Sequence, residues 1–373
     1  MPLRALARVN LAAIERNCER LGKELGTGTA LGAVVKADGY GHGAAPVARA
    51  ARAGGARWLC VATAEEAAEL RAAGLEGRIL VMGALSAEEL PAALEARADI
   101  VAWRESFVAE LEASARSTPV RVHVKLDTGM GRLGTRDAAE ADRVAAQVAA
   151  APGLELAGAM THFATADEDP SFLAEQLAAF APWVHSLRAS HPGLLVHAAN
   201  SAATLAEPAS HFDLVRCGIA IYGMDPFHED PASRGLEPAL ELSSYVAEIK
   251  EAAVGESAGY GRRFVAERPT RVATLPIGYG DGIRRALTND CDVLIRGRRH
   301  PLVGTVSMDN VTVDVSETPG VMPGDRAVLL GGDGQEYQSA EELARRMGTI
   351  NYEVTCGISA RVPREHHRDG GPA

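Results

Sequence analysis

The sequence predicts an α/β fold class, with an N-terminal (β/α)8 TIM-like barrel followed by a C-terminal, mostly-β domain. Short apolar runs rich in β-branched residues recur through the first two thirds of the chain, alternating with Ala-, Leu- and Glu-rich segments of helical periodicity. Eight such units occur, and their apolar runs lack polar alternation, which is typical of parallel strands covered on both faces. After Tyr222 the pattern changes to short runs separated by Pro, Gly and Asp turns.

The eight predicted barrel strands are separated by segments with helical periodicity. The strands are expected at residues 31–35, 58–61, 79–82, 100–102, 120–126, 154–160, 194–197 and 214–221, and helices at 11–25, 64–73, 87–96, 137–150 and 172–189. In barrels of this kind the functional residues follow the strands on the C-terminal rim. Polar residues directly after a predicted strand therefore have more functional weight than others.

The second domain follows a turn-rich segment that contains Asp225, Pro226 and Pro231. Its strands are expected at residues 246–250, 271–275, 293–296, 311–315 and 327–330, with one late helix at 340–347. We therefore expect residues 1–230 to form the barrel and residues 231–373 to form a β-rich domain, which the N-terminal strand is a candidate to join.

The composition is that of a folded protein, with 47% hydrophobic and 23% charged residues over 373 positions. The net charge of -11 argues against nucleic acid as a partner, because such binding needs clustered Lys and Arg. The start of the chain has no apolar signal segment, and no uncharged run reaches membrane-spanning length, so we expect a cytoplasmic protein without a membrane partner. The five cysteines form no Cys-x-x-Cys pair, which favours reduced thiols.

Several polar residues stand on the predicted rim. They are Lys36, Arg132, His162, Asn200 with Ser201, and Arg216 with Gly218. An apolar strand before Lys36 can desolvate its ammonium and lower the pKa, as a Schiff-base lysine requires. By itself the same position would equally suit a lysine that extends from a strand end to solvent.

Two other patterns point to different chemistry and carry less weight. Residues 129–134 fit the Gly-x-Gly-x-x-Gly dinucleotide fingerprint, but Lys125 and Asp127 precede it and it follows the fifth predicted strand, not the first. The eleven histidines contain no His-Glu-x-x-His or other tight ligand spacing, so no metal is expected and most of them are interpreted as solvated or structural.

A series of polar and glycine-rich motifs runs through both predicted domains. The motifs are AVVKADGYGHG (33–43), KLDTGMGRLG (125–134), THFA (161–164), ANSA (199–202), VRCGIAIYG (215–223), GYG (259–261), IGYGDG (277–282), SMD (307–309) and INYEV (350–354). In kind and in order this series resembles the alanine racemases, a family of pyridoxal 5'-phosphate enzymes of fold type III, over the whole chain.

The resemblance implies an isomerase that interconverts L-alanine and D-alanine by two-base proton transfer on the external aldimine of the cofactor, supplying D-alanine for peptidoglycan. Lys36 would hold the cofactor and act as one base, and Tyr260 would be the opposing base. The implied cofactor-binding residues are Lys36, Tyr40, His162, Asn200, Ser201, Arg216, Gly218, Ile219 and Tyr352. The implied substrate-binding residues are Arg132, Met308, Asp309 and Tyr279.

The implied roles suit the chemistry of the residue types. An always-charged Arg216 facing the pyridine nitrogen would leave that nitrogen unprotonated, which weakens the ring as an electron sink. A tyrosine is a poor base at its ordinary pKa near 10, so positive charge from His162 and Arg216 would have to favour the phenolate. In the family the tyrosine base belongs to the other subunit, which implies a homodimer with shared active sites.

The resemblance also leaves questions open. Lys125 corresponds to a lysine that is carbamylated in many relatives, although an ordinary ion pair with a carboxylate is the alternative. A racemase of serine or of another amino acid would share the same fold and cofactor set. A non-catalytic pyridoxal-phosphate carrier has the barrel alone, and a fold-related decarboxylase would lack the Arg132 motif and the tyrosines Tyr279 and Tyr352.

Overall fold

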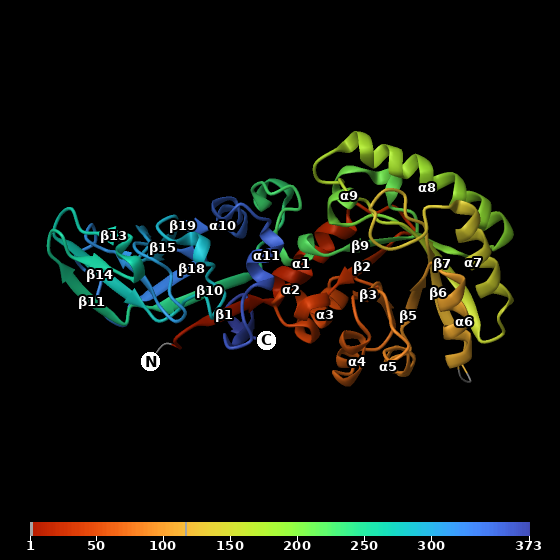
Figure 1. Ribbon diagram of the computed structural model, residues 1–373, viewed down its shortest axis with the longest axis horizontal. Coiled ribbons are helices and arrows are strands. Elements are labelled where there is room, and N and C mark those ends of the chain that lie inside the picture. Colours follow the sequence, from red (N-terminus) through yellow and green to blue (C-terminus); the bar gives the residue numbers. More distant parts are fainter. Residues whose placement is uncertain (1–2, 116–117) are drawn as a thin grey trace. The chain divides into compact units, whose positions relative to one another are not determined.

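The computed structural model of the chain describes residues 3–115 and 118–373, which form two compact units (Figure 1). The barrel unit consists of Ile14–Gly39 and Ala44–Phe227. The β unit contains the N-terminal segment through Ala13, the short segment Tyr40–Gly43, and His228–Ala373. The chain therefore leaves the barrel unit for four residues after Gly39, in the turn that follows the first barrel strand.

The barrel unit contains eight parallel strands, which confirms the predicted fold class. In pairing order they are β8 (Leu195–His197), β7 (Leu154–Met160), β6 (Val120–Lys125), β5 (Asp99–Ala102), β4 (Arg78–Val81), β3 (Trp58–Val61), β2 (Ala30–Val34) and β9 (Leu214–Cys217). Two backbone bonds link the ends of this series, from Asp213 N to Val196 O at 3.0 Å and from Arg216 N to Ala199 O at 2.9 Å. The strands are largely buried on both faces, which explains the apolar sequences of β2 and β3, whereas β6 alternates Val with Arg121, His123 and Lys125.

Helices lie outside the ring of strands (Figure 1). They are α1 (Leu11–Gly22), α3 (Ala44–Ala53), α4 (Ala64–Ala72), α5 (Leu90–Glu95), α6 (Glu105–Ser114), α7 (Ala138–Ala150), α8 (Pro170–Ser190) and α9 (Ser201–Ala206). Local signals set several of their starts: Thr63 and Glu66 form a capping box on α4, and Asp137 and Asp169 cap α7 and α8. No helix of residues 3–115 and 118–373 has the length and apolarity to cross a bilayer.

The last barrel strand is shorter than the expected span of 214–221. β9 ends at Cys217, and Ile219–Tyr222 form a 3-10 helix, because Gly218 adopts φ -104° and ψ -93° and leaves the extended conformation. The Tyr222 hydroxyl then donates to Val34 O at 2.9 Å and fixes this turn against β2. The expectation of a continuous strand was wrong here, and the difference places the backbone of Gly218 and Ile219 on the rim.

The β unit contains two sheets and a two-stranded hairpin. The larger sheet has the order β16 (Arg298–Pro301), β15 (Asp292–Ile295), β18 (Arg326–Asp333), β10 (Leu240–Tyr245), β1 (Leu6–Asn10), β20 (Arg364–Arg368) and β21 (Gly371–Pro372), and β19 (Glu336–Gln338) pairs with β18. The smaller sheet is β11 (Glu248–Ala252), β14 (Thr270–Leu275) and β17 (Val311–Asp314), and the hairpin is β12 (Ser257–Ala258) with β13 (Phe264–Val265). Two helices, α10 (Ala340–Met347) and α11 (Asn351–Cys356), follow.

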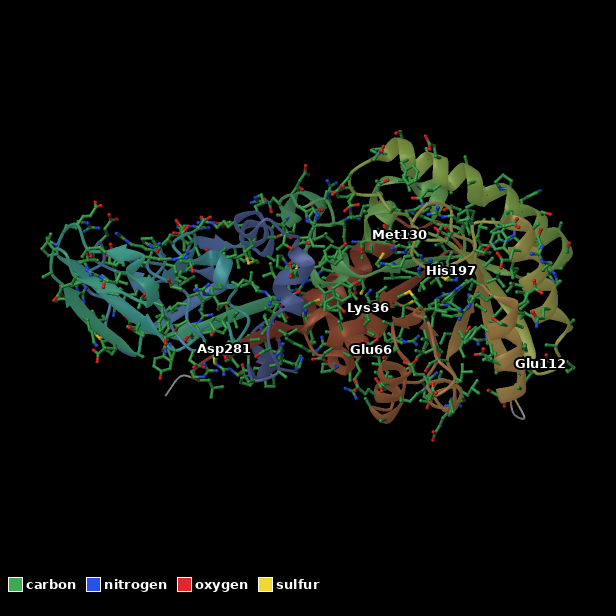
Figure 2. All side chains as sticks on the ribbon, in the orientation of Figure 1. Lys36, Glu66, Glu112, Met130, His197 and Asp281 are labelled. Atoms are coloured by element: carbon green, nitrogen blue, oxygen red, sulfur yellow. The ribbon has the colours of Figure 1, made fainter. Side chains whose placement is uncertain are left out.

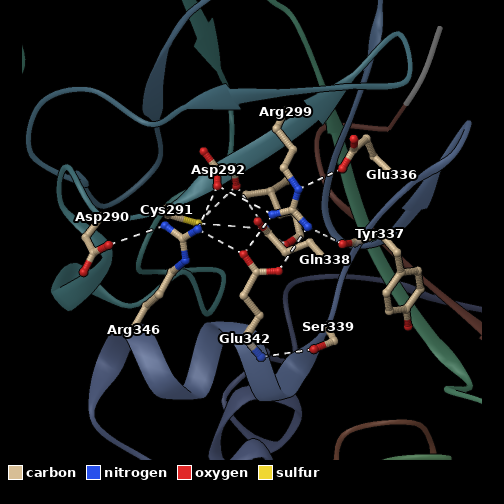
Figure 3. Close-up of polar contacts among 11 residues, drawn as sticks. Asp290, Cys291, Asp292, Arg299, Glu336, Tyr337, Gln338, Ser339, Glu342 and Arg346 are labelled. Atoms are coloured by element: carbon tan, nitrogen blue, oxygen red, sulfur yellow. Dashed lines mark hydrogen bonds and ion pairs between the residues drawn. The ribbon is translucent and has the colours of Figure 1, made fainter. Parts of the chain in front are cut away.

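An ionic cluster attaches α10 to the larger sheet (Figure 3). Arg299 of β16 binds Glu342 of α10 at 2.8 Å, and Arg346 of α10 binds Asp292 of β15 at 2.8 Å. Burial opposes the charge on Glu342, but hydrogen bonds from Arg299 and Arg346 hold its pKa below the usual value. Because each carboxylate is shared between two arginines, this network is expected to contribute more than isolated surface pairs do.

A close approach inside the barrel unit requires glycine at position 158. A Cβ atom on Gly158 of β7 would lie 2.3 Å from His123 Nδ1 and 2.7 Å from Leu195 O. Gly158→Ala is therefore expected to lower the free energy of unfolding by about 1–3 kcal/mol, as overpacking does. Urea unfolding measures this, with Gly22→Ala as the control, because a Cβ there meets nothing within 4 Å. Equal losses in both variants would contradict the assignment of strain to Gly158.

Candidate active site

The barrel residues singled out from the sequence stand on one rim. Lys36 comes two residues after the end of β2, Lys125 is the last residue of β6, and His162 follows β7 by two residues. Arg216 is the third residue of β9. The carboxyl ends of parallel strands meet at the same end of a barrel, so these side chains come from neighbouring positions.

Lys36 begins a left-handed turn. The next four residues have φ values of 51° (Ala37), 51° (Asp38), 61° (Gly39) and 53° (Tyr40), a conformation that costs non-glycine residues about 1–2 kcal/mol each. Side chains of the barrel unit hold the turn: Ala37 N donates to Glu66 Oε1 at 2.6 Å, and Ala44 N donates to Asp38 Oδ1 at 2.8 Å. Both Lys36 and Glu66 belong to the barrel unit (Figure 2). The backbone that carries Lys36 is thus fixed by specific contacts, as is common at functional sites.

Arg216 is buried among acceptors of the barrel interior. Its NH1 donates to His197 Nδ1 at 2.8 Å, and its NH2 donates to Thr161 O and Ala198 O, both at 2.9 Å, and to His162 Nδ1 at 3.2 Å. Burial lowers the pKa of Arg216 to about 10, so the guanidinium remains charged at neutral pH. Its Nε is buried and has no partner among the described residues. One donor is therefore available to a bound group.

His162 is neutral in this arrangement. Desolvation and the positive charges of Arg216 and Lys125 hold the pKa of His162 well below its usual value. The expectation that His162 supplies positive charge was wrong, because its neighbours are themselves cations. Since Arg216 donates to Nδ1, the ring proton of His162 lies on Nε2, where it can donate a hydrogen bond.

Ser201 and Gly218 form a small polar turn beside β9. Ser201 Oγ accepts hydrogen bonds from Gly218 N at 2.9 Å and from Ala220 N at 3.4 Å, and Ile219 lies between these donors. Asn200 has a structural role here, because its Oδ1 accepts from Ala203 N at 3.0 Å and caps α9. A hydroxyl surrounded by backbone N–H groups suits an anionic oxygen.

Lys125 and the turn after it lie on the same rim. Burial, then Arg216 and Arg132, lower the pKa of Lys125 to about 8, while Asp127 opposes the shift. Asp127 accepts from Gly131 N at 3.0 Å and from Gly129 N at 3.1 Å, and so organises the turn. Gly129, Gly131 and Gly134 all have positive φ. The glycines that imitate a dinucleotide fingerprint are thus required by the turn itself.

The β unit gathers its predicted site residues on three neighbouring loops. Thr305 Oγ1 donates to Tyr260 O at 2.7 Å, and Tyr279 N donates to Ser307 O at 2.9 Å, next to Met308. The side chains of Tyr260, Met308 and Tyr279 are 73%, 51% and 43% exposed in the isolated chain. A large exposed tyrosine with an exposed methionine is typical of a surface that binds another molecule.

Two further features of the β unit concern predicted residues. The rings of Tyr40 and Tyr352 lie with their centroids 6.0 Å apart, so two residues distant in sequence are neighbours. Asp309 pairs with Arg361 at 2.5 Å, and Arg361 also binds Asp281 at 2.7 Å. The carboxylate of Asp309 therefore has a structural partner within its own chain.

Asp281 forms a buried ion pair whose contribution depends on pH. Burial opposes its charge, but hydrogen bonds from Arg4 and Arg361 lower the pKa of Asp281 to about 2. An unfolded aspartate titrates at about 3.9, so the ion pair stabilises the fold fully above about pH 4 and loses this contribution as the pH falls from about 4 to about 2. Asp281→Asn is expected to lower the free energy of unfolding at pH 7 by about 1–3 kcal/mol.

Unfolding of the two proteins in urea between pH 3 and pH 7 tests this expectation. The difference between wild type and Asp281→Asn should shrink toward pH 3. Glu365→Gln is the control, because the Arg8–Glu365 pair at 3.1 Å is exposed and should contribute at most about 1 kcal/mol. A difference independent of pH would contradict the role of the Asp281 charge.

Comparison with known proteins places this geometry in a family. Residues 9–226 match the family described as alanine racemase, N-terminal domain, and residues 239–366 match alanine racemase, C-terminal domain. The chain belongs to the alanine racemase family. This confirms the resemblance drawn from the motifs.

Individual members of the family are similar over nearly the whole chain. Alanine racemase 2 of Caldanaerobacter subterraneus subsp. tengcongensis is 39% identical over 95% of this chain and 93% of its own length. The alanine racemase of Symbiobacterium thermophilum is 41% identical over 96% of both chains. The crystal structure of alanine racemase from D-cycloserine producing Streptomyces lavendulae has a TM-score of 0.93 at 38% identity, covering 98% of both chains.

Alanine racemases depend on pyridoxal 5'-phosphate, and the residues present fit that cofactor. The unpartnered Nε of Arg216 is a donor suited to a ring nitrogen that carries no proton. The turn formed by Ser201 and Gly218 suits a phosphate, and Lys36 offers an amine at a barrel rim. The adjacent hydroxyphenyl groups of Tyr40 and Tyr352 are of a kind that binds phosphate oxygens.

Sequence reasoning missed several residues that build this site. Thr161 and His197 hold Arg216, Glu66 holds the turn after Lys36, and Asp127 holds the turn before Arg132. A usable signal existed for His197, because a titratable residue inside an apolar strand needs a partner. Glu66 could also have been noticed, because it stands three residues after Thr63, the spacing of a capping box.

Proposed function

We propose that this chain interconverts L-alanine and D-alanine, with Lys36 and Tyr260 as the two bases, and that it supplies D-alanine for peptidoglycan in the cytoplasm. The observation that carries this proposal is the buried, charged Arg216 with one unpartnered donor, on the same rim as Lys36 in a member of this family. Racemisation requires a proton to leave one face of the substrate Cα and another to arrive on the opposite face, so two bases are needed.

The cofactor, when bound, supplies an aldehyde that an amine can hold and a ring that withdraws electrons from Cα. Arg216 cannot act as an acid toward the ring nitrogen at neutral pH, since its pKa remains about 10. Its Nε would donate a hydrogen bond to that nitrogen and leave it without a proton. Arg216 would thereby limit how far the bound group withdraws electrons and favour return of a proton to Cα.

The base opposite Lys36 is assigned to Tyr260. With His162 neutral, positive charge near a phenolate would come from Arg216, and His162 would contribute its Nε2–H as a hydrogen-bond donor. Lys36 would move the proton on the other face of Cα. These two roles predict that the enantiomers lose their Cα protons to different residues.

Substrate size and orientation are assigned to the residues that the family resemblance implies. Arg132 has a planar set of donors suited to the substrate carboxylate, assisted by the backbone N–H of Met308, with Asp309 beside it. Tyr279 and Tyr352 would restrict the side chain to about the size of a methyl group. One additional group changes discrimination by only about 1–3 kcal/mol, so slow turnover of serine is expected.

We further propose a homodimer in which Tyr260 and Met308 of the β unit complete the site on the partner subunit. The exposure of Tyr260, Met308 and Tyr279 supports this assignment, because large apolar side chains this exposed favour a contact with another chain. A two-fold symmetric dimer would then contain two identical shared sites.

A mixing experiment tests function and assembly together. Lys36→Ala and Tyr260→Phe are each expected to be inactive when assayed alone with L-alanine, L-serine or L-lysine. After denaturation, mixing in equal amounts and refolding, half the dimers would be hybrids with one intact site, restoring about a quarter of wild-type alanine racemisation. If mixing restores no racemisation, both bases of a site belong to one chain. If the wild-type protein binds the cofactor but forms no D-alanine, it is a carrier and not a racemase.

Lys125 is proposed to be carbamylated, as its counterpart is in many relatives. Carbamylation requires the neutral amine, and at a pKa of about 8 roughly three quarters of the groups are neutral at pH 8.5 but only about 3% at pH 6.5. Carbon-13 NMR with labelled bicarbonate should show a carbamate signal that strengthens from pH 6.5 to 8.5. The signal should be absent from Lys125→Arg, and its persistence there would assign it elsewhere.

A further inference from the structure

A chain of hydrogen bonds leads from Arg216 through the barrel interior. Arg216 NH1 lies 2.8 Å from His197 Nδ1, His197 Nε2 lies 2.9 Å from His123 Nδ1, and His123 Nε2 lies 3.1 Å from Asp99 Oδ2. All four residues are buried. Asp99 is the first residue of β5, whereas His197 is the last of β8, so the chain runs from the rim that carries Lys36 toward the opposite end of the barrel. We call Asp99, His123 and His197 the Asp99 relay.

The direction of every hydrogen bond in the relay follows from its two ends. A guanidinium can only donate, so His197 Nδ1 accepts and the His197 proton lies on Nε2. His197 then donates to His123 Nδ1, which places the His123 proton on Nε2, facing Asp99. Asp99 accepts as a carboxylate. A second proton on either histidine would set two donors against each other, so both rings must be neutral.

The surroundings of Asp99 and His197 favour the charge states that this direction requires. Burial opposes the charge on Asp99, but hydrogen bonds from His123 and Arg121 hold its pKa below the usual value. Arg121 Nε lies 3.0 Å from Asp99 Oδ2. Burial, then the charge of Arg216, hold the pKa of His197 well below its usual value. The relay is thus a neutral histidine pair between a fixed cation and a fixed anion.

The barrel is shaped around the relay. The register of β6 on β7 shifts between Val122 and His123, and Gly158 opposite leaves the space that the imidazole occupies. Trp58 packs edge-on against His123, with ring centroids 5.8 Å apart at 86°. A bulge and a missing side chain at one point in a short strand pair are specific adaptations to this histidine.

A purely structural role does not account for the relay. Barrel interiors are ordinarily filled by apolar layers, and replacing buried polar groups by apolar ones is often neutral or stabilising. Nor do these residues form a metal site, since no three His, Cys, Asp or Glu side chains within 3–115 and 118–373 are grouped to bind an ion. Among the residues that the structure describes, the relay reaches the active-site rim through the contact between His197 and Arg216.

We propose that Asp99, His123 and His197 are positioning residues, whose one-directional hydrogen bonds hold the Arg216 guanidinium so that Nε remains its donor for the cofactor. This inference rests on the proposed function, because Arg216 acts through the cofactor. The relay anchors NH1, and the carbonyls of Thr161 and Ala198 anchor NH2. Without a charged Asp99 the histidines lose their fixed direction, and His197 can turn a donor toward Arg216.

Nitrogen-15 NMR of the histidine side chains tests the direction without any assay of racemisation. His123 and His197 are assigned with the variants His123→Gln and His197→Gln. In the wild type both rings should carry a proton on Nε2 only. A proton on His197 Nδ1, or a doubly protonated ring, would overturn the proposal even if the protein is an alanine racemase. If both rings carry the proton on Nε2 but the protein has no racemase activity, the proposed function is wrong while the hydrogen-bond directions of the relay hold.

Variants test the consequence for the cofactor. Asp99→Asn and His123→Gln should shift the absorption band of the bound cofactor, which responds to its ring nitrogen, and lower kcat about 10–100-fold while KM changes less than about threefold. His211→Gln is the matched control, because His211 is also buried in the barrel unit but donates to Thr204 O at 2.9 Å, outside the relay. A folded His123→Gln with wild-type spectrum and kcat would overturn the proposal. If Asp99→Asn fails to fold, the absorption band and kcat of His123→Gln and the nitrogen-15 NMR of the wild type still test the proposal.

Discussion

Tyr260→Phe is expected to stop removal of the Cα proton from L-alanine while leaving the protein folded and loaded with cofactor. The phenylalanine ring fills the same space but has no group that can accept a proton. General-base catalysis contributes about 10²–10⁴-fold, so racemisation should fall by at least about 10²-fold in both directions. Proton NMR in D2O measures deuterium entry at Cα, which should cease for L-alanine and continue for D-alanine, since Lys36 remains.

The control for this substitution is Tyr337→Phe. Tyr337 lies on β19 of the same unit and is also partly exposed, so the variant removes an equivalent hydroxyl without affecting the proposed site. It should exchange both enantiomers at the wild-type rate. Unchanged exchange from L-alanine in Tyr260→Phe would exclude this residue as the base, whereas loss of exchange from both enantiomers would indicate damage to cofactor binding.

Lys36→Ala is expected to have a still larger effect, because it removes both the amine that holds the cofactor and one of the two bases. Racemisation should fall by at least about 10³-fold. Borohydride reduction should fix the cofactor covalently to Lys36 in the wild type, and peptide mass analysis should find it on the Lys36 peptide. In the variant no peptide should carry the cofactor. The retained absorption band of non-covalently held cofactor would show that the phosphate-binding residues still function.

Lys250→Ala provides the comparison for Lys36→Ala. Lys250 is exposed on β11 of the β unit, so its loss removes one amine and no proposed contact. This variant should keep wild-type racemisation and wild-type borohydride labelling at Lys36. Covalent labelling that persists at another lysine in Lys36→Ala would move the attachment point and contradict the assignment.

The barrel strands could be predicted because burial on both faces makes most of them apolar, and because the short runs recur between helical segments. Helices α3, α6, α9 and α11 were not predicted. α3 contains Pro46, and α6 follows Arg104, which forms no side-chain cap, so neither segment has the start signals that identified α4 and α7. The left-handed turn after Lys36 was also unpredictable, since three of its four residues are not glycine and the contacts that hold it are distant in sequence.

The roles of the individual site residues could be predicted from the sequence to different extents. Lys36 followed from its strand and its flanks, whereas Tyr260 depended on resemblance alone, because an exposed tyrosine between two glycines has no distinguishing local pattern. The charge state of His162 could not be read from the sequence, since it depends on Arg216 and Lys125 beside it in space. Treating most histidines as solvated or structural overlooked His123 and His197, whose significance lies in mutual contacts between β6 and β8.

The pairing of β1 has a consequence for how the chain matures during synthesis. β1 lies between β10 and β20, so a strand that is synthesised before the barrel pairs with segments that begin at Leu240 and Arg364. The entire barrel is translated before either partner exists. β1 must therefore wait with both edges open, and the charged Arg8 within it, with Arg4 just before it, is of the kind that discourages pairing with the wrong strand.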